Sequence, residues 1–238
     1  MRAKFAETDF LAAALAIAVE HGPAAATVAS ISDRLKAPTG SFYHRFASRD
    51  VLLGNLWLKT ILDFQQGVSA ALDAGDGLAA ALHTPSWARE HLDEARLLLV
   101  FDREDFVAGS WPEELRERVA EMTRRMKNAA PRRARAVFGR DGAEERRLAQ
   151  FLISEVPVAA VREHLKCGEA PPPIVDRMVR TTYAAIVADY RPATAWPAPR
   201  RELTDARLNY GGNDAYRCTV AGRSRYHRQG SGMHGDHR

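Results

Sequence analysis

The sequence lacks any apolar run long enough to cross a bilayer, because arginine and acidic residues interrupt every candidate along its 238 residues. Cysteine is nearly absent as well, since only Cys167 and Cys218 occur and they are far apart. Two distant cysteines are too few for a disulfide-rich scaffold or a cysteine-based zinc site. Together these absences predict a cytoplasmic protein that has no membrane partner.

Signatures of catalysis are also missing. No G-x-S-x-G segment, Walker loop or H-E-x-x-H segment occurs in the chain. His91 and His164 each follow a glutamate, but they are too isolated from each other to indicate a metal site. The sequence therefore predicts that the protein is not an enzyme and needs no cofactor.

Positive charge is concentrated at one end of the chain. The whole sequence has a net charge of +4, yet the stretch from Arg191 onward carries nine arginines against four acidic residues. This stretch is dominated by Pro, Gly, Arg and His without apolar periodicity, which predicts a disordered basic tail over residues 191–238. Three roles stay open for it: an arm that adds nonspecific DNA affinity, a functionless extension, or sequence translated out of its ancestral frame.

The body before residue 191 is predicted to be all-α. Apolar residues recur there at helical spacing, and the alternation typical of strands is scarce. Pro and Gly suggest where helices end, including a break at Thr84-Pro85 and a kink near Pro131. The longer helices expected after residue 86 are 87–107, 112–138, 143–167 and 174–190.

Residues 27–46 predict a helix, a tight turn and a second helix. Thr27 can cap the first helix, and Pro38 suits the first turn of the second because its missing N–H would be unpaired there anyway. Phe42 and Phe46 stand one turn apart and are expected to face the core. The other face of this helix carries small and polar side chains, which fits entry into a DNA major groove. The alternative is a solvated face on a helical unit that binds no DNA.

The run TVASISDRLKAPTGSFYHRFASRDVLLGNLW, residues 27–57, resembles the DNA-binding part of the TetR family of transcriptional regulators. The resemblance extends back through LAAALAIAVEHGPAAAT and covers about residues 4–64. It implies a three-helix head with its helix-turn-helix motif at 27–46, followed by a larger helical effector-binding and dimerisation domain at 65–190. A homodimer on palindromic operator DNA is implied as well, with helices 143–167 and 174–190 forming the interface between the two copies.

The same resemblance assigns roles on the DNA-facing side. Pro38 departs from it, because the family often has Ser or Thr at that position and proline supplies no hydroxyl. Base-facing positions are expected at Thr39, Ser41 and His44, where Gly40 keeps the helix end slim. The other DNA-binding candidates, expected at phosphates or supplying charge nearby, are Thr27, Lys36, Tyr43 and Arg49.

A cavity for a small-molecule effector is expected among the helices between Ser48 and Phe138. Aromatic and methionine side chains at helical spacing are its candidate lining, and they suit an apolar or amphipathic ligand. The same pattern also fits an ordinary core. The candidates are Trp57, Ile61, Phe64, Trp87, Phe101, Phe106, Met122 and Met126.

Two hypotheses follow for the function. The first is a ligand-responsive, sequence-specific transcriptional repressor. The second is a helical small-molecule-binding or scaffold protein whose degenerate head no longer reads DNA. The second hypothesis is supported by Pro38 and by the small net charge of residues 1–50, which carry six basic and five acidic residues.

Overall fold

The computed structural model describes residues 5–107 and 111–191, and all of them fall in one unit of the chain. Within these ranges the chain is helical and contains no strand, as the sequence predicted. The predicted tail, from residue 192 onward, lies outside the described residues. No helix in the described ranges combines the length and apolarity needed to cross a bilayer.

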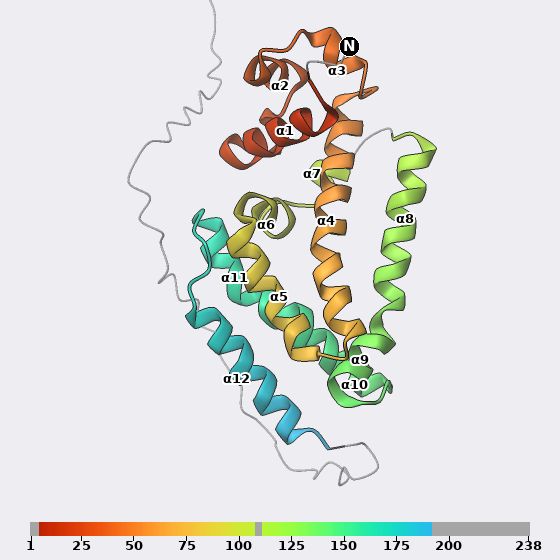
Figure 1. Ribbon diagram of the computed structural model, residues 1–238, viewed down its shortest axis with the longest axis vertical. Coiled ribbons are helices and arrows are strands. Elements are labelled where there is room, and N and C mark those ends of the chain that lie inside the picture. Colours follow the sequence, from red (N-terminus) through yellow and green to blue (C-terminus); the bar gives the residue numbers. More distant parts are fainter. Residues whose placement is uncertain (1–4, 108–110, 192–238) are drawn as a thin grey trace, which may run out of the picture. The chain divides into compact units, whose positions relative to one another are not determined.

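Four helices and one short turn make up the N-terminal part of the structure. Helices α1, α2 and α3 gather around the first turns of the long helix α4 (Figure 1). The Ser48 hydroxyl caps α4 as expected, accepting a hydrogen bond of 3.2 Å from the backbone N–H of Val51. The elements are α1 (Glu7–His21), η1 (Pro23–Ala25), α2 (Val28–Leu35), α3 (Thr39–Tyr43) and α4 (Arg49–Asp73).

The remaining helices pack against α4 or against the helices that contact it. Helices α5 and α8 both contact α4, and α12 contacts α5 and α11 (Figure 1). Their bounds are α5 (Gly77–Glu90), α6 (Leu92–Leu99), α7 (Glu104–Val107), α8 (Glu113–Asn128), α9 (Ala130–Phe138), α10 (Ala143–Gln150), the π-helical turn η2 (Phe151–Glu155), α11 (Val156–Lys166) and α12 (Ile174–Asp189).

Two of the predicted helix boundaries are wrong. Pro85 does not end a helix but lies inside α5, where it is buried. Because α5 packs against α4, α11 and α12, tertiary contacts outweigh the local cost of a proline without an N–H. The helix predicted over 87–107 is instead divided among the end of α5, α6 and α7, with a break at His91, whose φ of −133° is not helical.

One continuous core joins the N-terminal helices to the helices that follow. Phe42 and Phe46 are buried as predicted, and both rings meet Phe10 edge-on at centroid distances of 5.9 and 6.3 Å. The same cluster of buried side chains includes Phe106, from α7, and Met122, from α8. The orientation of the first three helices is therefore set partly by residues that lie far along the chain.

His83 joins α5 to α4 through a half-buried contact. Its Nε2–H donates to the backbone carbonyl oxygen of Phe64 at 3.0 Å, and its ring packs over Gly67. A Cβ at residue 67 would lie 2.1 Å from the imidazole, so the glycine makes room for this contact. Burial lowers the pKa of His83 below its usual 6.5, against opposing effects of the Phe64 carbonyl and Glu90.

This shift predicts that the protein loses stability as the solution is acidified. Well above pH 6.5 the imidazole is neutral in both the folded and unfolded states, so it adds no pH dependence there. Below that pH the unfolded chain takes up the proton first, which favours unfolding. Melting temperatures measured between about pH 7.5 and pH 5.5 should fall less steeply in His83→Gln than in the wild type. A folded His83→Gln protein whose melting temperature falls as steeply as that of the wild type would contradict this prediction.

Candidate nucleic-acid interface and effector cavity

Helices α2 and α3 form the helix-turn-helix unit that the sequence predicted. Thr27 caps α2, because its Oγ1 accepts a hydrogen bond of 3.1 Å from the Ser30 N–H. Lys36 then adopts a left-handed backbone with φ of 53°, and no other non-glycine residue in the described ranges has a positive φ. The N–H of Ala37 donates to the Ser32 carbonyl at 2.9 Å, which closes the turn before Pro38.

The outer face of α3 gathers most of the predicted DNA-binding residues. Thr39, Gly40 and His44 are exposed, and 57% of Tyr43 is exposed. Ser41 is half-buried. Since Phe42 anchors the opposite side of the helix, this short segment presents a slim polar surface with one large aromatic side chain.

Gly40 has no structural role in the free protein. Its φ is not in the left-handed region, and a Cβ added there would meet nothing within 4 Å. The other glycines of the described ranges either have a positive φ or face an atom that a Cβ would approach within 3.0 Å. The small size of residue 40 therefore offers room for something outside the chain.

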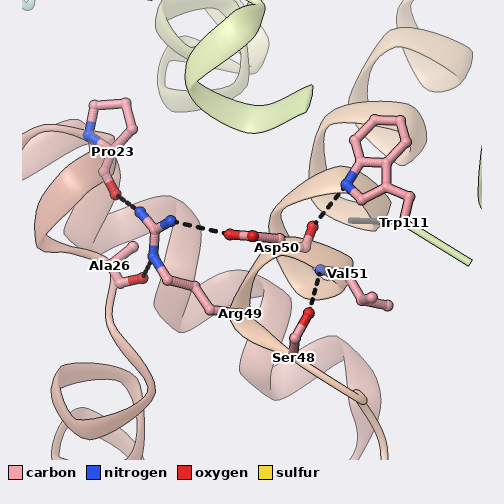
Figure 2. A network of polar contacts seen from close by, with 7 residues as sticks. All are labelled: Pro23, Ala26, Ser48, Arg49, Asp50, Val51 and Trp111. Carbon is pink, nitrogen blue, oxygen red and sulfur yellow. Dashed lines mark hydrogen bonds and ion pairs between the residues drawn. The ribbon is translucent and has the colours of Figure 1, made fainter. Parts of the chain in front are cut away.

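Arg49 lies in a different setting from the one that the resemblance suggested. Figure 2 shows its guanidinium turned toward the turn that precedes α2, where Nε donates to the Ala26 carbonyl and Nη2 to the Pro23 carbonyl, both at 2.8 Å. Nη1 pairs with Asp50 at 3.3 Å. Arg49 thus links the start of α4 to the turn between α1 and α2, and its contact with a DNA phosphate stays a prediction.

Trp111, just before α8, also makes a hydrogen bond to the start of α4. Its Nε1–H donates to the Asp50 carbonyl oxygen at 3.2 Å (Figure 2). The indole lies so close to α4 that a Cβ at residue 54 would be 2.7 Å from Cζ2, so Gly54 permits the contact. The sequence analysis did not predict this hydrogen bond, because Trp111 and Asp50 are 61 residues apart.

A cavity of about 500 Å³ lies beside α4, walled by α8 and η2. Five of the eight predicted lining residues border it, whereas the other three pack elsewhere. Phe106 is buried in the core shared with the head, and Phe101 packs against that core. Trp87 is buried in a separate core cluster, where its ring packs against Phe64 with the two centroids 5.1 Å apart. The predicted residues that border the cavity are Trp57, Ile61, Phe64, Met122 and Met126.

Part of the cavity wall is positively charged. Arg103, Lys127 and Arg133 border it together with the apolar residues. They come from three separate segments of a chain that is rich in arginine, so no local pattern marks them. Only the packing of α8 and α9 beside α4 brings these cations to one cavity.

Comparison with known proteins supports the head and the fold. The family model for bacterial regulatory proteins of the tetR family matches residues 10–56. The fatty acid degradation regulator FadR from Bacillus halodurans has a similar structure, with a TM-score of 0.55 and 16% identity over 80% of this chain and 99% of that one. For the ketosteroid transcriptional regulator KstR2 of Mycobacterium tuberculosis, the TM-score is 0.48 and the identity 16%, over 78% of this chain and 94% of that one. A search of curated protein sequences found no match.

Proposed function

From the premise that this helical chain carries the DNA-binding head of the TetR family, we propose that it is a ligand-responsive repressor acting in the cytoplasm. It would bind operator DNA as a homodimer and release it when a small molecule enters the cavity beside α4. No catalytic step and no cofactor are part of this function.

The exposed face of α3 is the observation that carries the proposal. Thr39, Ser41 and His44 would face base edges in the major groove, and Gly40 would let the backbone approach them closely. Tyr43 would donate its hydroxyl to a phosphate. Thr27 and Lys36, at the two ends of α2, would add further backbone contacts.

Helix α12 supports the proposed dimer. Large apolar side chains remain exposed at only four positions of the described ranges: Tyr43, Met126, Ile174 and Met178. The last two lie on one face of α12, and Thr181 and Ala185 continue that face at helical spacing. A partner subunit that covers this face with its own α12, and with the segment 143–167, would bury these side chains in a four-helix interface.

Helix α4 supports a link between ligand and DNA. Its middle carries Trp57, Ile61 and Phe64 at the cavity, and its first turn is fastened to the head through Arg49. A ligand that shifts the middle of α4 would therefore move the head, and with it the distance between the two α3 helices of a dimer.

The proposal is tested by recovering the DNA that the protein binds. Genomic fragments captured by the full-length protein should share a palindromic sequence, and in gel-shift assays that sequence should bind at least about a thousandfold more tightly than a scrambled duplex. Equal affinity for the two duplexes would favour the alternative of a small-molecule-binding or scaffold protein with a degenerate head.

A further inference from the structure

The cavity beside α4 is joined by a second cavity of about 670 Å³ that lies between α4 and the junction of α8 and α9. The two have common walls, because Gln65, Val68, Met122, Met126 and Arg133 border both. A ligand bound in either cavity would therefore lie near Arg133.

The walls of both cavities combine apolar side chains with positively charged ones. Arg103, Lys127 and Arg133 border the first cavity, and Arg125, Arg132 and Arg133 border the second. Among the residues that the structure describes, no aspartate or glutamate borders either of them. The charged side chains that border the two cavities are therefore all positive.

Three of these cations already have partners. Arg125 pairs with Glu121 at 2.7 Å, and Arg132 pairs with Asp73 at 2.7 Å. The guanidinium of Arg103 lies over the ring of Trp57, 5.1 Å from its centroid. An anion inside the cavity would have to compete with these contacts for Arg125 and Arg132.

Arg133 differs because its charge is half-buried without compensation. Among the described residues no carboxylate lies within 4.0 Å of it, and the Met126 carbonyl accepts a hydrogen bond of 3.4 Å from Nη1. Its Nε is shielded from solvent and has no hydrogen-bond acceptor in the described structure. Burial, reinforced by the neighbouring charge of Arg132, lowers the pKa of Arg133.

An entirely apolar ligand would remove still more water from this guanidinium and leave its charge unpaired, which is costly. An anionic group would instead accept two parallel hydrogen bonds from the guanidinium and neutralise it. We propose that the cavity binds an amphipathic anion, with a carboxylate or phosphate at Arg133 and an apolar chain packed among Trp57, Phe64 and Ile153. This inference names the ligand class for the ligand-responsive function proposed above and rests on it.

Four ligands with the same ten-carbon chain test the proposal directly. Decanoate, decyl phosphate, decanol and decylamine would be titrated into the full-length protein by calorimetry, without DNA. At least one of the two anions should bind about tenfold or more tightly than decanol, and decylamine should bind most weakly. The better of the two anions would distinguish a carboxylate from a phosphate ligand. The proposal is overturned if decanol or decylamine binds as tightly as both anions, or if neither anion binds.

Substitutions on α9 locate the anion. Arg133→Gln should lower the affinity for the preferred anion about tenfold and leave the affinity for decanol unchanged, whereas Arg133→Lys should retain part of the preference. The matched control is Arg135→Gln on the same helix, because Arg135 pairs with Asp141 and does not border either cavity. An unchanged preference in an Arg133→Gln protein with wild-type circular dichroism would also overturn the assignment.

The binding result can be separated from the result for DNA. If the anion binds and leaves operator affinity unchanged, the ligand class stands and ligand-responsive repression fails. If the protein binds its operator but prefers no anion, the regulatory function stands and the ligand class fails.

Discussion

Met178→Arg is expected to convert the dimer into a monomer and to lower operator affinity by roughly 10²–10⁴-fold, the range that linkage of two binding units contributes. The side chain of Met178 is 52% exposed on the proposed dimer face of α12, next to Ile174, which is 41% exposed. In a dimer this position would be covered by the partner, so an arginine would bury a charge without a counter-ion. Sedimentation velocity would measure the oligomeric state, and gel shifts on full and half operators would measure binding.

Glu114→Arg is the control for the added arginine. Glu114 is exposed at the start of α8, away from α10, α11 and α12 in the sequence, so this variant should remain a dimer with wild-type affinity. Because Met178 is more than half exposed in one copy of the chain, the helical content of the monomer should be close to that of the wild type. A Met178→Arg protein that sediments as a dimer would place the interface elsewhere.

The double variant Tyr43→Ala with Thr39→Ala is expected to bind operator about a hundredfold more weakly, since each lost hydroxyl contact is worth on the order of 1–2 kcal/mol. Both residues are exposed on α3, so the melting temperature should change little. Tyr43→Phe alone would separate the hydroxyl from the ring, which packs edge-on against Phe42 at 5.4 Å. Gel shifts at two or more salt concentrations would measure the affinities.

Asp33→Ala provides the comparison within the same helix-turn-helix unit. Asp33 is exposed on α2, near the turn but not on the face of α3, so its removal should not weaken operator binding. If the double variant is folded and binds as tightly as Asp33→Ala, then α3 is not the reading helix and the proposed function is wrong in its central claim.

Much of the head was predictable because its signals are local. The caps Thr27 and Ser48 each bond to an N–H three residues away, and Phe42 and Phe46 are one turn apart. A side chain and a backbone group so close in sequence find each other in any fold that forms the helix. The exposed face of α3 follows from the same short-range geometry.

The cavity was predictable only in part, because its lining depends on how whole helices pack. Trp57, Ile61 and Phe64 share one helix, and the structure places all three at the cavity. Trp87 and Phe106 have the same apolar character but lie in cores, since α5 and α7 turn them toward other helices. Residue type alone does not distinguish a core position from a cavity wall.

The sequence by itself determined the helical class of this protein, the helix-turn-helix at 27–46 and the small polar surface of α3, since each depends on residues within a few turns of one another. Only the tertiary structure decided that Arg49 reaches back to Pro23 and Ala26, that Trp111 bonds to Asp50, and that Arg133 borders a cavity without an ion-pair partner among the described residues. These contacts join segments distant in the chain. Whether they form depends on the total free energy of packing all the helices, and this cannot be deduced from any short stretch of the sequence.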